Sequence, residues 1–233
     1  GSGTIFMSHC SLRCSFCINW DISHKGGGAG QSIDELAEMM LSLQDMGCPN
    51  INVVTPTHYS PHILLALHSA AEKGLNIPLV YNTCGWERME VLQLLDGVVD
   101  IYLCDFKYYD SAMATRYSCD AHSYPQVTQQ ALLEMHRQVG EAVPKPNGLM
   151  YGGLMIRHLV MPNNVSGTQE VLGWIYNNLG ANTYINLMSQ YMPVYKAQTD
   201  NLIGRRITRK EYMEAVDFAN TLGFTNLEIQ GMR

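Results

Sequence analysis

The chain alternates between two hydrophobic patterns. Short runs rich in β-branched and aromatic residues are separated by longer stretches in which apolar residues recur every three or four positions. The short runs predict strands, and the longer stretches predict amphipathic helices. Six strands are expected, at residues 4–8, 51–55, 78–83, 100–105, 154–161 and 184–189. Strands that alternate with helices in this way are typical of a parallel sheet with helices packed against it.

Capping residues mark the ends of the first long helix. Ser32 and Glu35 have the spacing of a capping box, in which each side chain accepts a hydrogen bond from the backbone of the other residue. Gly47 ends this helix, because glycine readily adopts the left-handed conformation found after a helix. The remaining helices are expected at residues 61–73, 87–95, 126–139, 169–179 and 208–222.

The number of strand and helix units sets the fold class. Six units are fewer than the eight that a closed barrel requires. We therefore expect an α/β fold with a partial, open (β/α)6 barrel of parallel strands, forming a single domain over residues 1–233. In barrels of this kind the active site lies at the C-terminal ends of the strands. Residues that directly follow each strand are therefore the first candidates for function.

Composition narrows the classes of protein. Hydrophobic residues make up 46% of the chain and charged residues 15%, which is enough apolar material for one sizeable core. No apolar run approaches the roughly 20 residues of a membrane span, and the first residues lack the pattern of a signal peptide, so we expect a cytoplasmic protein. The formal charge of -6 and the absence of a basic block argue against nucleic acid as a partner.

Three of the seven cysteines crowd into eight residues directly after the first expected strand. The odd number and the crowding favour metal ligation in a reducing compartment over a disulfide framework. Cys10, Cys14 and Cys17 place three soft thiolate ligands in one loop, which suits an iron-sulfur cluster. A cluster of four irons held by three cysteines leaves one iron open to a chelating molecule.

A zinc site is the alternative for the same three cysteines. Structural zinc sites usually pair two short groups of ligands, and this sequence has no second group. His9 or His24 would have to supply the fourth ligand alone. The spacing therefore favours the iron-sulfur cluster.

The cysteine spacing, with the aromatic residue Phe16 before the third cysteine, resembles the radical S-adenosylmethionine superfamily. The segments GSGTIFMSHCSLRCSFCINW, VTPTHY, YNTCGW, DFKYYD and NLMSQY are similar to the uncharacterised branch related to pyruvate formate-lyase activating enzyme. The resemblance implies a radical SAM core in which Cys10, Cys14 and Cys17 hold a 4Fe-4S cluster and S-adenosyl-L-methionine chelates its open iron. Reduction of the cluster would then split the cofactor into methionine and a 5'-deoxyadenosyl radical.

The resemblance also implies cofactor contacts near the first two strands. Phe16 would lie beside the adenine of S-adenosylmethionine. Many relatives carry Gly-Gly-Glu after the second strand, whereas this chain carries Thr55-Pro56-Thr57-His58. Backbone carbonyls and the hydroxyl of Thr57 would then replace the carboxylate, which makes Thr55 and Thr57 candidates. His58 is either a proton donor or a surface histidine at a helix start.

Further contacts are implied at the ends of the later strands. Asn82 ends the third strand, where relatives place small polar residues near the ribose or the carboxylate of the cofactor. Gln190 and Tyr191 end the sixth strand, where relatives contact the adenosine.

Two cations complete the candidate set. Alternation along the fourth strand turns Asp105 and Lys107 toward the inside of the barrel and Cys104 toward the helices. By resemblance, Lys107 would meet the cofactor carboxylate. Arg157 lies within an apolar strand, and a buried arginine requires a partner. That partner is either a carboxylate or hydroxyl of the cofactor, or Asp105 in a structural ion pair.

The other cysteines show no paired spacing, so we expect one cluster only; they are Cys48, Cys84, Cys104 and Cys119. Members of the resembled branch often carry an N-terminal extension with further cysteines. This chain begins at its first strand, which leaves open that such a segment precedes it.

The expected activity is abstraction of hydrogen from a protein or peptide, as in the anaerobic activation of a glycyl-radical enzyme, with electrons from a flavodoxin- or ferredoxin-like donor. The segment before the cysteines lacks the arginine that activating enzymes carry there. Two alternatives stay open: radical modification of a small molecule, and a non-catalytic iron-sulfur protein for electron transfer. The sequence assigns no catalytic acid or base.

Overall fold

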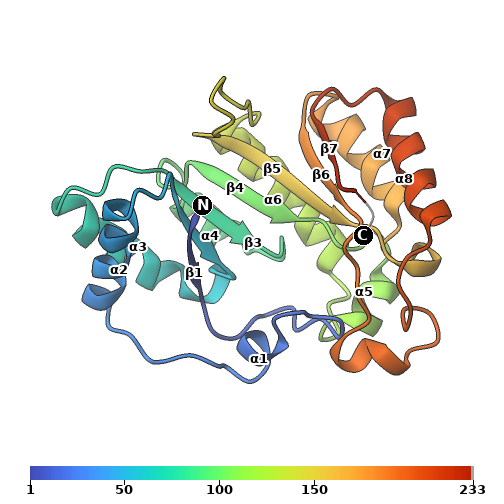
Figure 1. Cartoon of the computed structure of the whole chain (residues 1–233), viewed down its shortest axis with the longest axis horizontal. Helices are drawn as coiled ribbons and strands as arrows, with labels where there is room; N and C mark the ends of the chain where they lie inside the picture. The colour runs from blue at the N-terminus through green and yellow to red at the C-terminus, as the bar shows by residue number, and fades with distance from the viewer. Residues whose placement is uncertain (232–233) are drawn as a thin grey trace.

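The computed structural model describes residues 1–231, and its centre is a single sheet of seven parallel strands. The strands lie in chain order from one edge of the sheet to the other, and each pairs in parallel with the next. Their bounds are β1 Gly3–Phe6, β2 Ile51–Val54, β3 Leu79–Thr83, β4 Ile101–Asp105, β5 Gly153–Leu159, β6 Tyr184–Met188 and β7 Leu227–Ile229. Within residues 1–231, β1 and β7 are the two edges, so the barrel is open (Figure 1).

Eight α-helices and three short 3-10 helices connect the strands within the described residues. The α-helices are α1 Trp20–Ser23, α2 Ile33–Asp45, α3 Ser60–Glu72, α4 Met89–Leu94, α5 Ser111–Tyr117, α6 Tyr124–Val139, α7 Thr168–Leu179 and α8 Arg209–Leu222. The 3-10 helices are η1 Thr57–Tyr59, η2 Pro162–Asn164 and η3 Tyr195–Thr199. None of the helices within residues 1–231 combines the length and the apolar character that crossing a bilayer requires.

The predicted α/β class and open parallel barrel are confirmed, with one correction to the strand count. The sequence predicted six strands, but β7 adds a seventh beside β6. This strand has only three residues, and two of them are exposed, so it lacks a run of buried apolar positions that would predict it. The capping box of α2 is present, with Ser32 Oγ accepting from the Glu35 backbone N–H at 3.2 Å.

Two of the α-helices, α1 and α5, were not predicted. Helix α1 is a single turn directly after the three cysteines. Helix α5 lies within residues 110–124, which the sequence pattern left without an element, and it begins where the Asp110 side chain accepts a hydrogen bond from the Met113 backbone N–H at 2.9 Å. Both helices end beside the cysteine loop and shape its surroundings.

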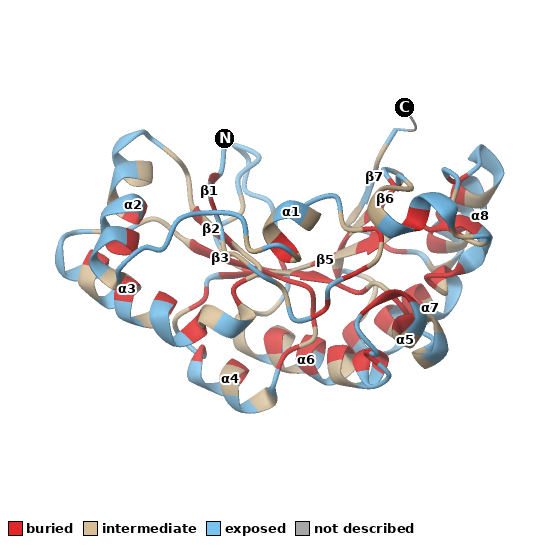
Figure 2. Ribbon diagram, turned by 90° about the horizontal axis from the view of Figure 1, so that it is seen from below, coloured by how far each residue is buried: buried red, intermediate tan, exposed pale blue. Residues whose placement is uncertain are grey.

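The two faces of the sheet have different cover. Figure 2 shows α3, α4, α6 and α7 along one face, whereas the small helix α1 lies on the other. Side chains between the sheet and the outer helices form the core, including the fully buried Ile51, Tyr81, Tyr102, Ile63 and Leu132. The inner face carries polar residues in matching register, since Asp105 pairs with Arg157 and Arg157 with Asn186 across β4, β5 and β6. A polar, largely uncovered inner face is therefore available to a ligand.

Candidate cofactor-binding site

The cysteine loop leaves the C-terminal end of β1 and returns against α5. Arg13 adopts a left-handed backbone with φ of 44°, which allows the tight turn between the first two cysteines. An isolated antiparallel bridge joins Cys14 to Ser118, the residue after α5. The cysteine loop is thus fastened to a segment more than a hundred positions later in the chain.

Each of the three cysteines has a polar neighbour at its sulfur. The Ser118 hydroxyl donates to Cys14 Sγ at 3.1 Å, and Ser23 Oγ lies 3.2 Å from Cys17 Sγ. A hydrogen bond with the Cys84 thiol lowers the pKa of Cys10 to about 6, and this shared proton together with burial raises the pKa of Cys84. Burial raises the pKa of Cys14 to about 11. Such neighbours resemble the hydrogen bonds that tune sulfur ligands of iron-sulfur clusters.

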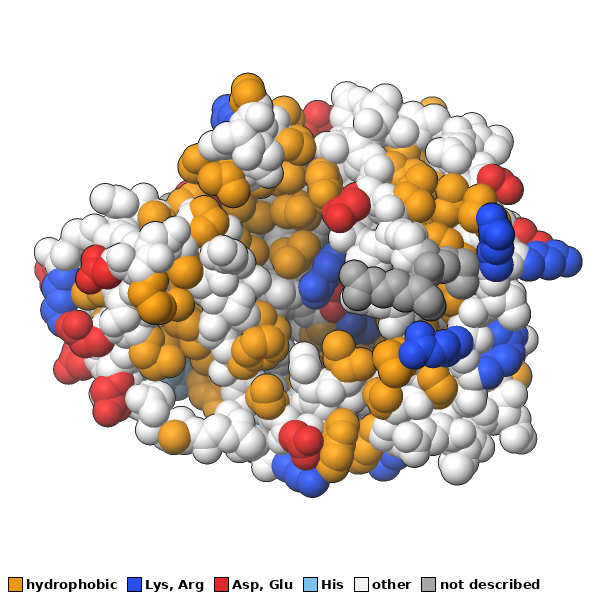
Figure 3. Space-filling view, in the orientation of Figure 1, with side chains coloured by type: hydrophobic (Ala, Val, Ile, Leu, Met, Phe, Trp, Pro, Cys, Tyr) orange, Lys and Arg blue, Asp and Glu red, His pale blue; other side chains and the backbone are white. Residues whose placement is uncertain are grey.

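The three cysteines line one cavity of about 620 Å³ on the inner side of the barrel. The cavity wall also includes seven of the eight cofactor residues named from the sequence: Phe16, Thr55, Asn82, Lys107, Arg157, Gln190 and Tyr191. In Figure 3 the molecule is hollowed on this face, with Lys or Arg side chains at the bottom of the hollow. Six neighbouring strands, β1 to β6, and the cysteine loop thus meet around one space.

Asp105 sits between both candidate cations. Arg157 Nε donates to Asp105 Oδ1 at 2.7 Å, and Lys107 Nζ donates to Asp105 Oδ2 at 2.5 Å. Burial opposes ionisation of Asp105, but the two cations outweigh it and lower the pKa of this carboxyl. Burial likewise opposes the charge on Lys107, and Asp105 outweighs it, so the pKa of Lys107 is raised.

The structural ion pair considered for Arg157 therefore exists, and Arg157 faces the cavity as well. A second hydrogen bond, from Arg157 Nη2 to Asn82 Oδ1 at 2.8 Å, fixes the guanidinium plane against β3. Two cations share one carboxylate here, which leaves one net positive charge at the cavity wall. That wall is suited to an anionic group of a ligand.

Thr57 is the candidate that lies outside the cavity wall. Its hydroxyl donates to Glu87 Oε1 at 2.7 Å, and Thr83 Oγ1 donates to the same oxygen. Glu87 is 3% exposed, and burial raises its pKa to about 7. The sequence predicted that Thr57 replaces a carboxylate near the end of β2. The structure places a carboxylate there as well, because Glu87, in the turn between β3 and α4, lies beside Thr57.

Glu87 could not be predicted from the sequence, because its partners Thr57 and Thr83 follow or end two different strands. The turn that delivers it depends on Gly85, whose φ is 84° and whose position for a Cβ would lie 2.6 Å from the Asp105 carbonyl oxygen. The glycine was the one signal in the sequence for a tight turn here. Thr55 has a left-handed backbone as well, with φ of 59°, which is strained for a β-branched residue.

Of the remaining candidates, Phe16, Gln190 and Tyr191 line the cavity, whereas His58 lies on the protein surface. The Phe16 ring packs edge-on against Tyr191 at 5.8 Å, and the Tyr191 hydroxyl donates to the Ile203 carbonyl at 2.7 Å. Gln190 is exposed and lines the cavity. His58 is exposed and bonds to the Ser8 carbonyl at 2.8 Å, away from the cavity wall.

The donor set fits a cluster with one open iron. Three thiols from a single loop face the cavity, and no group of three or more His, Cys, Asp or Glu side chains within residues 1–231 converges on a single ion. His24 Nδ1 bonds to Ser23 Oγ at 2.9 Å, and His9 is exposed. Among the other cysteines, Cys84 lines the cavity, Cys104 is fully buried and Cys119 is exposed.

Comparison with known proteins supplies a family. A sequence model of the radical SAM superfamily matches residues 4–162. An uncharacterized protein of Methanocaldococcus jannaschii is 33% identical over 228 residues, which cover 94% of this chain and 62% of that protein. The chain therefore spans less than two thirds of this relative.

Solved structures share the fold at low sequence identity. The structure of SuiB from Streptococcus suis bound to S-adenosylmethionine superposes with a TM-score of 0.68 at 13% identity, covering 100% of this chain and 51% of SuiB. SuiB bound to its precursor peptide SuiA gives a TM-score of 0.67 at 12% identity, covering 99% and 48%. The hydrogenase maturase HydG from Carboxydothermus hydrogenoformans gives 0.66 at 10%, covering 97% and 52%. The chain spans about half of each.

Proposed function

Since the chain belongs to the radical SAM superfamily, we propose that it binds a 4Fe-4S cluster through Cys10, Cys14 and Cys17 and acts on a polypeptide. In the bound state the cluster would supply an electron that splits S-adenosylmethionine and yields a 5'-deoxyadenosyl radical for hydrogen abstraction. The observation that carries this proposal is one cavity lined by three thiols of a single loop and by two strand-end cations.

The chain's own residues would bind and orient the cofactor. Lys107 and Arg157 leave a net positive charge beside Asp105, which favours the cofactor carboxylate at this wall. Asn82 lines the cavity, and its Oδ1 accepts a hydrogen bond from Arg157. Its amide N–H groups can therefore donate to the cofactor. Phe16, held between Tyr108 and Tyr191, offers an apolar surface suited to the adenine ring.

The rim of the cavity supports a polypeptide substrate. Three large apolar side chains that line the cavity are exposed, namely Phe6 at 49%, Ile18 at 68% and Met192 at 42%. Sites for small molecules normally enclose most of the ligand surface, whereas exposed apolar side chains of this size mark surfaces for larger partners. SuiB, which shares this fold, has been solved with a precursor peptide.

Activation of a glycyl-radical enzyme is one form of this reaction. The hydrogen would then come from the α-carbon of a glycine, and the product would be a glycine-centred radical on the partner. Modification of another peptide residue uses the same cavity and the same rim. The two outcomes differ in the radical that remains on the polypeptide.

Isotope transfer tests the substrate class. The reduced, cluster-loaded protein is incubated with S-adenosylmethionine and a fully deuterated cell extract, separated by dialysis into macromolecular and small-molecule fractions. We expect deuterium in 5'-deoxyadenosine with the macromolecular fraction, and its loss after protease treatment of that fraction. Electron paramagnetic resonance of the same mixture detects a glycine-centred radical if activation is the role.

The Cys14→Ala variant is the matched control, because it retains the rim and loses a ligand. It should yield no 5'-deoxyadenosine with either fraction. Deuterium transfer from the small-molecule fraction alone would replace the polypeptide proposal by modification of a small metabolite. Absence of cofactor cleavage in the loaded wild-type protein would leave an iron-sulfur protein without radical chemistry.

A further inference from the structure

A continuous line of side chains leads from the cysteine loop to the protein surface. Cys17 Sγ contacts Ser23 Oγ at 3.2 Å, and Ser23 Oγ bonds to His24 Nδ1 at 2.9 Å. The His24 ring packs edge-on against Tyr195 at 4.9 Å, and Tyr195 stacks on Trp20 at 5.2 Å with an angle of 8° between the rings. Both aromatic rings are partly exposed.

Cations surround the outer end of this line. Lys25 Nζ lies 3.9 Å from the centre of the Trp20 ring, and Lys196 Nζ lies 5.6 Å from the centre of the Tyr195 ring. Arg13 comes from the cysteine loop itself, and Arg13 and Lys196 both oppose a charge on His24, whose pKa is lowered chiefly by burial. All three cations are exposed.

The charge of this patch is opposite to that of the whole chain. Lys25 is paired with Asp21 at 3.1 Å, whereas none of the ion pairs found within residues 1–231 involves Arg13 or Lys196. The formal charge of the whole chain is -6. A local excess of positive charge on an acidic protein attracts an acidic partner to one place on its surface.

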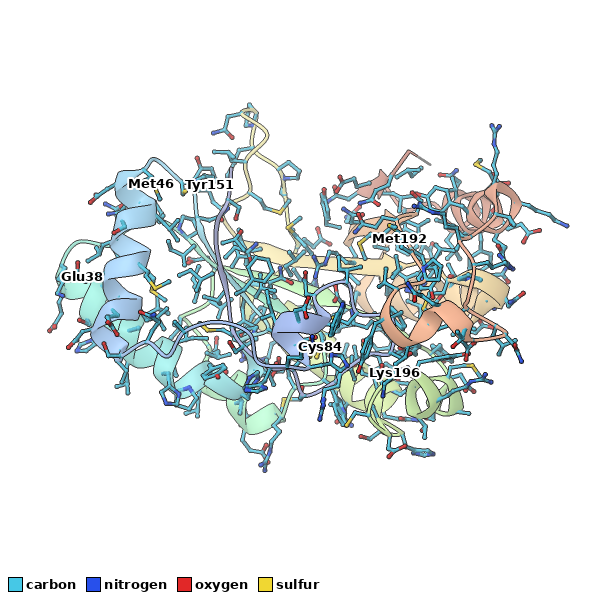
Figure 4. The ribbon with its side chains drawn as sticks, turned by 60° about the horizontal axis from the view of Figure 1, so that its bottom comes forward. Glu38, Met46, Cys84, Tyr151, Met192 and Lys196 are labelled. Atoms are coloured by element: carbon cyan, nitrogen blue, oxygen red, sulfur yellow. The ribbon has the colours of Figure 1, made fainter. Side chains whose placement is uncertain are left out.

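The patch is separate from the ligand cavity. Arg13, Trp20, Lys25, Tyr195 and Lys196 are absent from the cavity wall, although Cys17 and Ser23 belong to it. Figure 1 places α1 and the η3 segment at the lower edge of the molecule, and Figure 4 brings this side forward with Lys196 labelled. The backbone N–H of Lys196 donates to the Ser15 carbonyl at 3.1 Å, which fastens η3 to the cysteine loop.

We propose that this donor face, formed by Arg13, Trp20, Lys25, Tyr195 and Lys196, docks an acidic protein that delivers single electrons to the cluster. The donor, a reduced protein of the ferredoxin or flavodoxin class, loses one electron, and the cluster gains it. A partner on the donor face leaves the cavity free for the cofactor and the substrate. The inference rests on the cluster chemistry of the proposed function and does not depend on its substrate.

Charge reversal tests the donor face. The probe is an acidic plant-type ferredoxin, reduced beforehand, and the readout is the bleaching of the cluster absorbance after rapid mixing with loaded protein. In low salt, Lys196→Glu should slow this reduction at least tenfold, because it replaces attraction by repulsion at the docking surface. At high ionic strength the difference should shrink to less than twofold. Lys196→Arg should retain the wild-type rate.

Two controls separate docking from damage to the cluster. Lys210→Glu makes the same charge change on α8, at an exposed lysine that pairs with Glu214, and should leave reduction by ferredoxin unchanged. Dithionite, a small reductant that needs no docking surface, should reduce wild type and Lys196→Glu at equal rates. Titration of the cluster-free chain with ferredoxin should show weaker binding for Lys196→Glu only.

Three results would overturn the donor face. The first is an unchanged rate with ferredoxin in Lys196→Glu. The second is an equal slowing with dithionite, which would indicate a local structural role. The third is weakened capture of the polypeptide substrate with unchanged reduction, which would assign the face to the substrate. The first two results do not depend on whether the substrate proposal holds, because reduction of the cluster is measured without substrate.

Discussion

The hydroxyl of Ser118 donates a hydrogen bond of 3.1 Å to the sulfur of Cys14, 104 positions earlier in the chain. Both residues are buried, and the same two residues share the backbone bridge that fastens the cysteine loop to the end of α5. A hydrogen bond to a ligand sulfur stabilises the more negative, reduced state of an iron-sulfur cluster.

Ser118→Ala should therefore make the cluster harder to reduce. Loss of one such bond is worth about 1 kcal/mol, which for a one-electron couple corresponds to roughly 40 mV toward more negative potential. A redox titration of the loaded variant followed by electron paramagnetic resonance measures the shift. Ser111→Ala, on the first turn of the same helix, is the matched control and should leave the potential unchanged. A potential equal to that of wild type in Ser118→Ala would separate this hydroxyl from the cluster.

Ligation is tested at the cysteines themselves. Cys14→Ala should lose the cluster absorbance and all cofactor cleavage after anaerobic reconstitution, because two cysteine ligands are too few to hold the cluster. Cys119→Ala, at an exposed cysteine, and Cys48→Ala should each retain about four irons per chain. Iron and sulfide analysis of the reconstituted variants decides the assignment. Iron loss in either control would reveal a second metal site.

Arg157→Ala should weaken binding of S-adenosylmethionine without loss of iron. Charge-assisted hydrogen bonds contribute roughly 1.5–3 kcal/mol, so the dissociation constant should rise by roughly ten- to a hundredfold. Lys107 continues to neutralise Asp105 in this variant, which limits structural damage. Titration of the cluster spectrum with the cofactor gives the affinity, and Arg137→Ala, at an exposed arginine on α6, serves as control. An unchanged affinity would leave Arg157 with the structural ion pair alone.

Glu87 makes the free energy of unfolding depend on pH. Burial raises the pKa of Glu87 from its ordinary value of 4.5 to about 7 in the folded chain, so the folded state binds the proton more tightly than the unfolded state. The stability contribution of this site is therefore greatest below pH 4.5 and declines as the pH rises to 7. Glutamine does not titrate in this range, so Glu87→Gln should abolish the decline. The decline amounts to up to about 3 kcal/mol in the free energy of unfolding.

Denaturant unfolding of the cluster-free chain at several pH values measures this effect. The difference in unfolding free energy between Glu87→Gln and wild type should grow in favour of the variant from pH 4.5 to 7. Glu90→Gln, at an exposed carboxylate on α4, should show no such growth. A difference that stays constant with pH would contradict a buried, proton-binding Glu87.

The sequence predicts those parts of the site that depend on neighbours along the chain. The three cysteines lie in one loop, and the alternation of β4 turns Asp105 and Lys107 to the same side, so both features follow from local geometry. The open parallel sheet follows from six of its strands. Strand β7 was not predicted because it has only three residues, two of them exposed, which form no hydrophobic pattern and pair only with β6.

Contacts between distant segments were beyond the sequence for a physical reason. Glu87 meets Thr57 only because β2 and β3 pair in one register and their two turns pack together. Ser118 reaches Cys14 from the end of α5, a helix in a segment without a clear hydrophobic period. Such contacts require the relative placement of elements, which the pattern of a single chain does not specify.

The open sheet has a mechanical consequence. In a closed barrel, the number and stagger of the strands fix the radius, because hydrogen bonds run around the whole circumference. Within residues 1–231, β1 and β7 are not joined, so no backbone hydrogen bond spans the interior between them. The spacing between the cysteine loop at the β1 side and the β7 side is then set by sheet twist and side-chain packing. The width of the cavity can therefore change. A larger ligand can enter when β1 and β7 move apart, without loss of the backbone hydrogen bonds between neighbouring strands.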